Sequence, residues 1–245
     1  MVRGIYSAAA GMITQYKKLD VIGNNISNVN TSGFKQSGIT LTDEGKENIS
    51  STSDGKNVGS LPFCVVLNKE TTDFTDGALK ETNIGTNFAI DGNGFFAVES
   101  AAGGGVKYTR DGEFSVDSQG YLALSTGERL LSQNGSALYV GSSNFTVSTD
   151  GTVTRANGTK DKIQLYTARS QQNITSRKDG FYNITGAVAA NGQIEQGYLE
   201  ESNTDVIDNM TNMIASNRSF QGCQQAFQVS YQTLDKLVNQ VGTGK

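Results

Sequence analysis

Two short motifs in this chain have residue types that could hold a ligand. The first is Gly92-x-Gly94-x-x-Ala97, which loosely matches the glycine fingerprint of dinucleotide-binding sites. Such a site needs a strand before the glycines and a helix that begins among them, so that the helix N-terminus meets the pyrophosphate. Here the residues from Phe95 to Val98 continue as an apolar run that is typical of a strand. The motif is therefore predicted to be a turn between two strands.

The second motif places Arg110 beside Asp111 and two residues after Tyr108. A guanidinium group next to aromatic rings could bind a carboxylate or a sugar. A hairpin tip with a local Arg110–Asp111 ion pair explains the same residues equally well, and an exposed pair of this kind contributes only about 0–1 kcal/mol. The residues alone allow both interpretations.

The chain has no histidine. This excludes Ser-His-Asp triads, His-ligated zinc and most acid–base schemes that operate near neutral pH. Asp and Gly often occur together, but never with the spacing of a calcium-binding loop. No pair of carboxylates stands out as the acid and base of a glycosidase. We therefore predict that the chain is not an enzyme and has no catalytic residue, no cofactor and no metal site.

The composition limits the possible partners. The net charge of −4 offers no basic surface for nucleic acid. No run approaches the roughly 18 apolar residues that span a bilayer, and the first residues lack the pattern of a secretory signal. We therefore expect neither direct membrane insertion nor a cleaved signal peptide. Cys64 and Cys223 lie in segments of different character, and we expect two unconnected thiols rather than a disulfide.

Both ends of the chain carry apolar residues at steps of three and four, which is the spacing of a coiled coil. Near the N-terminus the set is Ile5, Ala9, Met12, Tyr16, Leu19, Ile22, Ile26 and Val29. Near the C-terminus it is Ile207, Met210, Ile214, Phe220, Phe227, Tyr231, Leu234, Val238 and Val241, with Asn217 and Gln224 at intervening positions. An amphipathic helix needs a partner for its stripe. The helices are expected to pair with each other, with neighbouring copies, or with both.

Several asparagines crowd the end of the first helix, namely Asn24, Asn25, Asn28 and Asn30. An asparagine on a helical seam sets the register by pairing with a polar partner. Asn217 and Gln224 are the partners that the sequence suggests, while exposed asparagines that fray into a loop are an equally good interpretation.

The fold class predicted for the whole chain is α+β, with long N- and C-terminal helices that pair as a coiled coil and a central antiparallel β domain. Asx-Gly pairs, such as Asp150-Gly151 and Asn157-Gly158, supply tight turns between short apolar runs over much of the chain. Residues 42–60 are polar and have the composition of a mobile linker or an exposed loop. The predicted segments are an N-terminal helical segment over 1–35, a linker and extended segment over 36–84, the central β domain over 85–170, a β return segment over 171–202 and a C-terminal helical segment over 203–245. Within the helical segments, the first helix is expected over 3–29, and the second from about 203 with Asn203, Thr204 or Asp205 as its N-cap.

Three motifs in this order resemble the rod and hook proteins of the bacterial flagellum. The first is LDVIGNNISNVNTSGFK at residues 19–35. The second comprises DGNGFF at residues 91–96 and YTRDG at 108–112, followed by Phe114, Asp117, Gly120, Tyr121 and Leu122. The third is GYLEESN at residues 197–203, followed by Asp205, Val206, Met210, Met213, Ile214 and Arg218. The resemblance covers nearly the whole chain.

This resemblance implies a structural subunit of the flagellar basal-body rod, which is exported through the flagellar type III apparatus and polymerises beyond the inner membrane into a helical tube that transmits torque from motor to hook. The implied partners are copies of itself and neighbouring rod and hook proteins. The third motif resembles the distal rod type, and a proximal-rod or short hook-type protein is the alternative. A secreted protein that binds glycan or another surface is the alternative from a different class.

Assembly would depend on residues of the two helices. The predicted assembly interface consists of Ile5, Met12, Leu19, Ile22, Asn25, Ile26, Val29, Ile207, Met210, Ile214, Asn217, Phe220, Phe227, Tyr231, Leu234 and Val238.

Overall fold

The computed structural model describes residues 2–50, 57–100, 105–177 and 180–241, and it divides the chain into two compact units. The helical unit comprises Met1–Ser27, Ser37–Asp73 and Asp205–Lys245, and the β unit comprises Asn28–Gln36 and Phe74–Thr204. Both units are therefore built from segments that are far apart in the sequence. No helix in the described part of the chain is long and apolar enough to cross a membrane.

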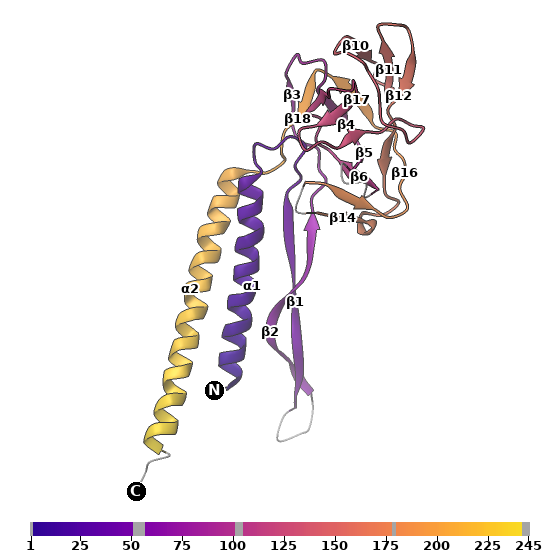
Figure 1. Cartoon of the computed structure of the whole chain (residues 1–245). Coiled ribbons are helices and arrows are strands. Elements are labelled where there is room, and N and C mark those ends of the chain that lie inside the picture. Colours follow the sequence, from indigo (N-terminus) through magenta and orange to yellow (C-terminus); the bar gives the residue numbers. More distant parts are fainter. Residues whose placement is uncertain (1, 51–56, 101–104, 178–179, 242–245) are drawn as a thin grey trace. The chain divides into compact units, whose positions relative to one another are not determined.

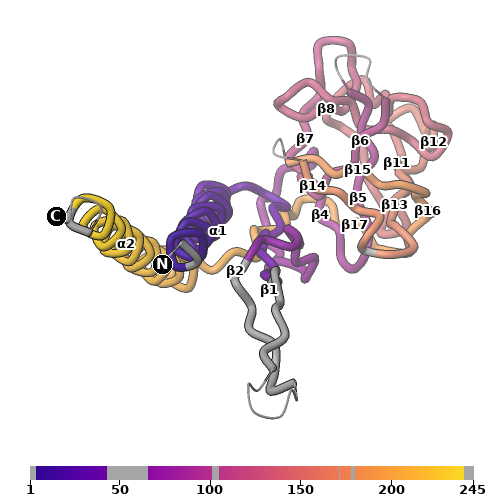
Figure 2. Tube along the Cα trace, turned by 90° about the horizontal axis from the view of Figure 1, so that it is seen from below, coloured from indigo at the N-terminus to yellow at the C-terminus, as the bar shows by residue number. Residues whose placement is uncertain are grey.

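Two long helices form the larger part of the helical unit. Helix α1 is Val2–Ser27, and helix α2 is Val206–Lys236, which continues into a π-helical turn η2 at Leu237–Val241. The two helices lie side by side and run in opposite directions (Figures 1 and 2). Helix α1 ends two residues earlier than the sequence predicts, and the polar residues that follow it form turns.

Helix α2 begins later than predicted because Asp205 caps it. The Asp205 carboxylate accepts hydrogen bonds from the backbone N–H groups of Ile207 (2.8 Å) and Asp208 (3.1 Å). These bonds satisfy two of the donors that a helix N-terminus leaves without intrahelical partners. Of the three N-cap candidates in the sequence, the structure selects Asp205.

The helical unit also contains a long antiparallel ribbon, which corrects the expectation of a linker or loop at residues 42–50 and 57–60, while residues 51–56 of that segment lie outside the described residues. Strand β1 is Ser37–Ser50 and strand β2 is Asn57–Thr72, paired from Ser37↔Thr72 to Ser50↔Asn57. The ribbon packs beside α1. Main-chain hydrogen bonds hold such a ribbon whatever its side chains are, so a polar composition did not exclude strands. Pro62 fits in β2 because a two-stranded ribbon leaves one side of each strand unpaired.

The β unit consists of short strands, and every pairing among its described residues is antiparallel. The strands are β3 Leu79–Glu81, β4 Phe88–Asp91, β5 Phe95–Glu99, β6 Val106–Thr109, β7 Phe114–Val116, β8 Leu122–Leu124, β9 Arg129–Leu130, β10 Phe145–Val147, β11 Thr152–Arg155, β12 Lys160–Lys162, β13 Leu165–Thr167, β14 Ile174–Ser176, β15 Tyr182–Ile184, β16 Val188–Ala189, β17 Gln193–Gln196 and β18 Tyr198–Glu200, with a 3-10 turn η1 at Gln171–Asn173.

The largest sheet has the order β14-β15-β6-β5-β9-β8-β7, with β13 paired to β5 and β16. Smaller pairings join β10-β11-β12, β17 to β4 and β18 to β3. This confirms an α+β chain with an antiparallel β domain. The apolar run at Leu138–Val140 makes only isolated bridges on either side of Leu138.

The core of the β unit is built from phenylalanine and aliphatic side chains of these strands. The rings of Phe88 and Phe96 both contact Phe114, with centroids 5.9 and 5.5 Å apart. Gly112 allows this packing, since a β-carbon there would lie 1.6 Å from the carbonyl oxygen of Phe88. The Asp111-Gly112 pair thus serves close backbone contact, whereas Gly151 has the positive φ (83°) that the sequence predicts for a turn.

The Gly92-x-Gly94 motif is a turn between β4 and β5, as predicted, and no helix starts in it. The dinucleotide interpretation therefore has no structural basis.

We expect Asp205→Ala to lower the free energy of unfolding by about 1 kcal/mol, because α2 loses its N-cap. Urea denaturation followed by circular dichroism measures this. Asp205→Asn is the matched control, because its side-chain oxygen can cap equally well and should leave the stability nearly unchanged. An equal loss in both variants would show that capping by Asp205 does not stabilise α2.

Candidate assembly surface

One face of α2 is covered within the chain, and its residues follow a strict seven-residue repeat. Every residue of α2 outside this face is exposed. We call this face the inner seam, and its members are Val206, Asn209, Met213, Ser216, Phe220, Cys223, Phe227, Ser230 and Leu234. Steps of three and four keep one side of a helix facing a neighbouring helix.

The inner seam faces α1 through small residues. A β-carbon at Gly11 would lie 3.0 Å from Sγ of Cys223, and one at Gly4 would lie 3.6 Å from Oγ of Ser230. A step of seven residues forward along α1, from Gly4 to Gly11, therefore corresponds to a step of seven residues backward along α2, from Ser230 to Cys223. The same step, taken twice more, leads from Gly11 to Asn25, whose Nδ2 lies 3.5 Å from Oδ1 of Asn209. Glycine, which weakens a helix in isolation, here lets the two helices approach closely.

Asn25 links three elements of the helical unit. Its side chain is buried, donates to the carbonyl of Ser37 (2.8 Å) and accepts from the N–H of Ser37 (3.0 Å), in addition to the contact with Asn209. A polar partner was one of the two interpretations of the asparagines at this end of α1, and within the chain Asn25 meets Asn209 rather than Asn217 or Gln224. The latter two are exposed, because they lie outside the inner seam.

A second apolar stripe of the C-terminal helix remains uncovered. We call it the outer stripe, and its members are Ile207, Met210, Ile214, Tyr231 and Val238, which are 51–76% exposed. Most of them follow an inner-seam residue by one position, which is about 100° around the helix. Helix α1 has a comparable outer cluster, namely Tyr6, Ile13 and Tyr16, which are 63–72% exposed. These exposed apolar groups are the candidate contacts for another surface.

The predicted interface residues separate into these two faces. On α2, the half-buried Phe220, Phe227 and Leu234 belong to the inner seam. The exposed residues are Ile207, Met210, Ile214, Asn217 and Tyr231 of α2 and Val238 of η2. Two successive steps of three residues, from Ile214 to Phe220, bring the sequence-based stripe onto the inner seam, and beyond Phe220 the stripe alternates between the inner seam and the outer stripe. Towards the N-terminus, Ile22 and Asn25 are buried, and Ile5, Met12, Leu19, Ile26 and Val29 are half-buried.

Sequence reasoning missed Tyr6 and Ile13 as candidate contacts. Their separation by seven residues, on the side of α1 opposite Gly4 and Gly11, is the signal that could have found them.

A buried ion cluster in the β unit joins segments from all three sequence motifs. Glu200 accepts from Lys35 and from Nη1 of Arg110 (3.1 Å), and the three side chains are at most 1% exposed. Lys35 also donates to the carbonyl of Thr75 (2.6 Å). Arg110 also pairs with the half-exposed Asp76 (3.1 Å). The cluster thus contains two buried cations around one buried carboxylate.

This arrangement corrects the predicted hairpin-tip ion pair. Arg110 is buried, pairs with Glu200 rather than with its neighbour Asp111, and donates to the carbonyl of Gly92 (2.9 Å). Its guanidinium carbon lies 5.4 Å from the ring centroid of Phe95. With its charge neutralised and its surface covered, Arg110 is not placed to bind a carboxylate or a sugar.

The cluster anchors residues 28–36, which follow α1 in the chain but belong to the β unit. The N–H of Gly33 donates to the carbonyl of Glu200 (2.7 Å), and the N–H of Gln36 donates to Oδ1 of Asn203 (2.8 Å). Burial lowers the pKa of Lys35, and the hydrogen bond and charge of Glu200 act in the opposite direction. Glu200 thus limits the decrease in the pKa of Lys35, whereas the nearby charge of Arg110 adds to that decrease.

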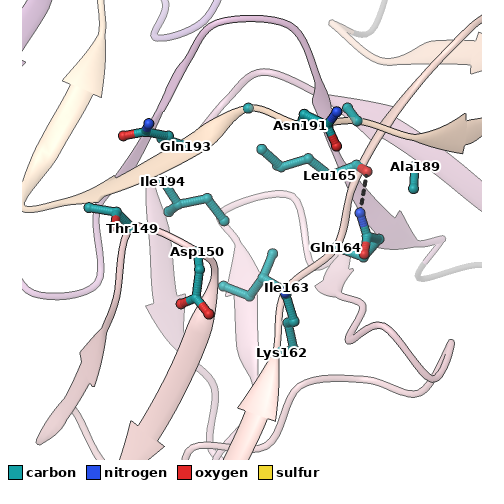
Figure 3. A pocket seen from close by; sticks show the side chains of 12 residues that line it. Thr149, Asp150, Lys162, Ile163, Gln164, Leu165, Ala189, Asn191, Gln193 and Ile194 are labelled. Atoms are coloured by element: carbon teal, nitrogen blue, oxygen red, sulfur yellow. Dashed lines mark hydrogen bonds between the residues drawn. The ribbon is translucent and has the colours of Figure 1, made fainter.

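The β unit also has a shallow pocket of about 450 Å³ between β12, β13 and β17 (Figure 3). Its floor is formed by the buried side chains of Ile163, Leu165 and Ile194. Asp150 is the only carboxylate among the residues that line it. A glycosidase needs two carboxylates that face each other across the substrate, so the pocket does not fit that chemistry. Among the described residues, no group of side chains has the composition of a metal site.

Comparisons with known proteins agree with the three motifs. Three protein-family models match the chain. Residues 5–35 match the family of the flagella basal body rod protein, and residues 89–155 match the flagellar hook protein FlgE/F/G D1 domain. Residues 195–241 match the C-terminal region of the flagellar basal body rod FlgEFG protein. Lys35, Arg110 and Glu200 each lie in a different one of these regions.

The similarity extends over the whole length of known rod proteins. The flagellar basal-body rod protein FlgG of Bacillus subtilis (strain 168) is 32% identical over 98% of this chain and 99% of its own length. The rod protein FlgF of Caulobacter vibrioides is 30% identical over 90% of each chain. The flagellar hook protein FlgE of Helicobacter mustelae is 37% identical, but over 52% of this chain and 30% of its own length.

Glu200→Gln is expected to lower the free energy of unfolding by about 3–5 kcal/mol, because it leaves two buried cations without their shared carboxylate. Lys35→Met should be less destabilising, since Glu200 still pairs with Arg110. Urea denaturation measures both. Glu201→Gln, which removes an exposed pair with Lys80, is the adjacent control and should change stability by less than about 1 kcal/mol. A smaller effect for Glu200→Gln than for Lys35→Met would contradict this description of the cluster.

Asp111 gives the β unit a pH dependence. Burial raises the pKa of this carboxyl group from 3.8 to about 6. At a pH between these two values, the Asp111 carboxyl group is protonated in the folded chain and ionised in the unfolded chain. Stability due to Asp111 is therefore present below a pH of about 4 and decreases as the pH rises through about 6. Asp111→Asn removes this loss of stability at higher pH and keeps an acceptor for the N–H of Glu113.

We expect this variant to be more stable than the parent by about 1–2 kcal/mol at pH 7.5, after allowance for partial solvent screening. The two chains should converge near pH 4 in urea denaturation. A difference that does not change with pH would rule out titration of Asp111 as its cause.

Proposed function

Since the chain belongs to the family of flagellar basal-body rod and hook proteins, which are structural components of the basal body and not enzymes, we propose that it polymerises into the helical axial tube of the rod. In this role it transmits torque from the motor to the hook. Its partners are copies of itself and neighbouring rod and hook proteins. It reaches this site through the flagellar type III export apparatus.

The observation that carries the proposal is the outer stripe of the C-terminal helix. Helix α1 covers the inner seam, and five large apolar side chains next to that seam remain exposed. Burying one such side chain against a neighbour gains about 1.5–3 kcal/mol. A helix with two apolar faces and one internal partner has a face left for another subunit, and repeated contacts of this kind generate a filament.

We further propose that α1 and α2 pair as an antiparallel coiled coil in the assembled rod. Three contacts support this, at Gly4, Gly11 and Asn25 of α1, because they recur in multiples of seven residues on both helices. A seven-residue repeat of contacts is the hallmark of a supercoiled pair. Asn25 and Asn209 supply the polar pair that fixes its register.

Within the rod we favour the distal segment. The support is the resemblance of residues 197–203, together with Asp205 and Val206, to the distal rod type. A proximal-rod protein or a short hook-type protein is the alternative within the same family. A flagellar hook protein matches 52% of this chain. This match supports the short hook-type protein as an alternative.

Ile214→Asp tests the proposal, because Ile214 is 57% exposed and lies on the outer stripe. The single chain should stay folded, whereas a carboxylate in the subunit contact should prevent incorporation into basal bodies and abolish motility. Val106→Asp is the control, an apolar residue of similar exposure (49%) in the β unit.

Soft-agar motility and immunoblots of purified basal bodies measure the outcome. Normal motility with Ile214→Asp, or loss of function with Val106→Asp alone, would contradict assembly through the helices. The second result would favour a protein that acts through a binding surface of its β domain.

A further inference from the structure

We propose that the N-terminal part of the outer stripe of one copy docks on the outer cluster of α1 of a neighbouring copy. The first surface consists of Ile207, Met210 and Ile214, and the second of Tyr6, Ile13 and Tyr16. The two copies are displaced by about 12 residues, or about 18 Å, along the helix axis. This inference rests on the proposed function, because a polymer supplies the neighbouring copy. It adds which two surfaces meet and by how much the copies are shifted.

The contacts between α1 and α2 provide a common axial scale for both helices. Gly4 lies level with Ser230, Gly11 with Cys223 and Asn25 with Asn209. Any residue of α1 can therefore be assigned the residue of α2 at the same height. On this scale Tyr6 lies level with Gln228, and Tyr16 lies level with Arg218.

The exposed apolar groups alternate between the two helices along this scale. The outer stripe of α2 is apolar at Ile207, Met210 and Ile214, and then becomes polar. The outer cluster of α1 lies level with this polar stretch, which contains Asn217, Gln221, Gln224 and Gln228. Beyond it the stripe contains the apolar Tyr231 and Val238, with the exposed Asp235 between them. Apolar surface on one helix is thus placed where the other helix is polar.

This alternation disfavours a neighbour at the same height. Without displacement, Ile13 of one copy would face Gln221 of the next, and burying an amide against an apolar side chain leaves its hydrogen bonds unmade. A shift of about 12 residues brings Ile13 opposite Met210 instead. It also places Tyr16 near Ile207 and Tyr6 near Ile214, so that three apolar pairs form together.

The C-terminal part of the outer stripe lies on the other side of the α1 cluster. Tyr231 and Val238 are about 12 residues from the centre of the cluster, on the side opposite Ile207, and Asp235 lies between them on the stripe. Only a copy shifted by the same amount in the opposite direction would bring its own α1 cluster level with these two residues. The three apolar residues Ile207, Met210 and Ile214 therefore set the direction of the displacement, which is about 18 Å at 1.5 Å per residue.

The two docking surfaces are different, which is what a growing polymer requires. Tyr6 and Ile13 follow Gly4 and Gly11 by two residues, about 200° around the helix, so they point away from α2. A contact between unlike surfaces passes from copy to copy without closing, whereas a contact between two identical stripes closes as a dimer. The α1 cluster and the outer stripe together form a contact that can propagate.

Disulfide cross-linking between two variants in one cell tests the displacement. Both variants carry Cys64→Ser and Cys223→Ser, one with Ile13→Cys and the other with Met210→Cys, and basal bodies are purified and oxidised. A cross-linked dimer on a non-reducing gel is the expected result. Tyr16→Cys with Ile207→Cys is a second displaced pair, and all four positions are more than 50% exposed, so the single chain should fold.

The matched control pairs Ile13→Cys with Gln221→Cys, which lie at the same height without displacement. Dimers from both displaced pairs, and none from the level pair, support the inference. Dimers from the level pair, or incorporation of all variants without dimers from the displaced pairs, overturn the displacement and leave the proposed function standing. If the parent chain without cysteine changes is absent from basal bodies, the proposed function fails and this inference fails with it.

Discussion

The C-terminal helix has more apolar surface than one partner within the chain can cover, and the proposed function follows from this constraint. The inner seam meets α1 through Gly4, Gly11 and Asn25, whereas the outer stripe from Ile207 to Val238 stays in water. Each of these side chains gains about 1.5–3 kcal/mol on burial. A second partner therefore stabilises the helices further, and a subunit that is completed only by its neighbours is suited to a continuous axial structure.

The buried ion cluster is the second constraint, and it acts inside the β unit. Lys35, Arg110 and Glu200 come from segments that are far apart in the sequence, and each lies in one of the three regions that match rod and hook proteins. Buried ion pairs add little net stability compared with apolar packing, but they are intolerant of missing partners. The cluster therefore makes correct placement of residues 28–36 and of β18 a condition for a stable β unit.

The sequence contained enough local information to predict the helices, the antiparallel β domain and the turn at Gly92, because periodicity and turn chemistry act over a few residues. Contacts between distant segments were not accessible in this way. Arg110 was paired with its neighbour Asp111, although Glu200 is its true partner, and the polar ribbon β1–β2 was taken for a linker. The predicted stripe mixes the two faces of the C-terminal helix beyond Asn217, since one residue of shift separates the inner seam from the outer stripe.

Quantitative mass spectrometry of purified hook–basal bodies tests the central claim most directly, by counting this chain against its axial neighbours. The claim that it is a polymerised rod subunit predicts that the chain is part of the particle in multiple copies. A large number matches the distal rod, and a handful matches the proximal segment. Absence of the chain from otherwise intact particles would contradict the claim.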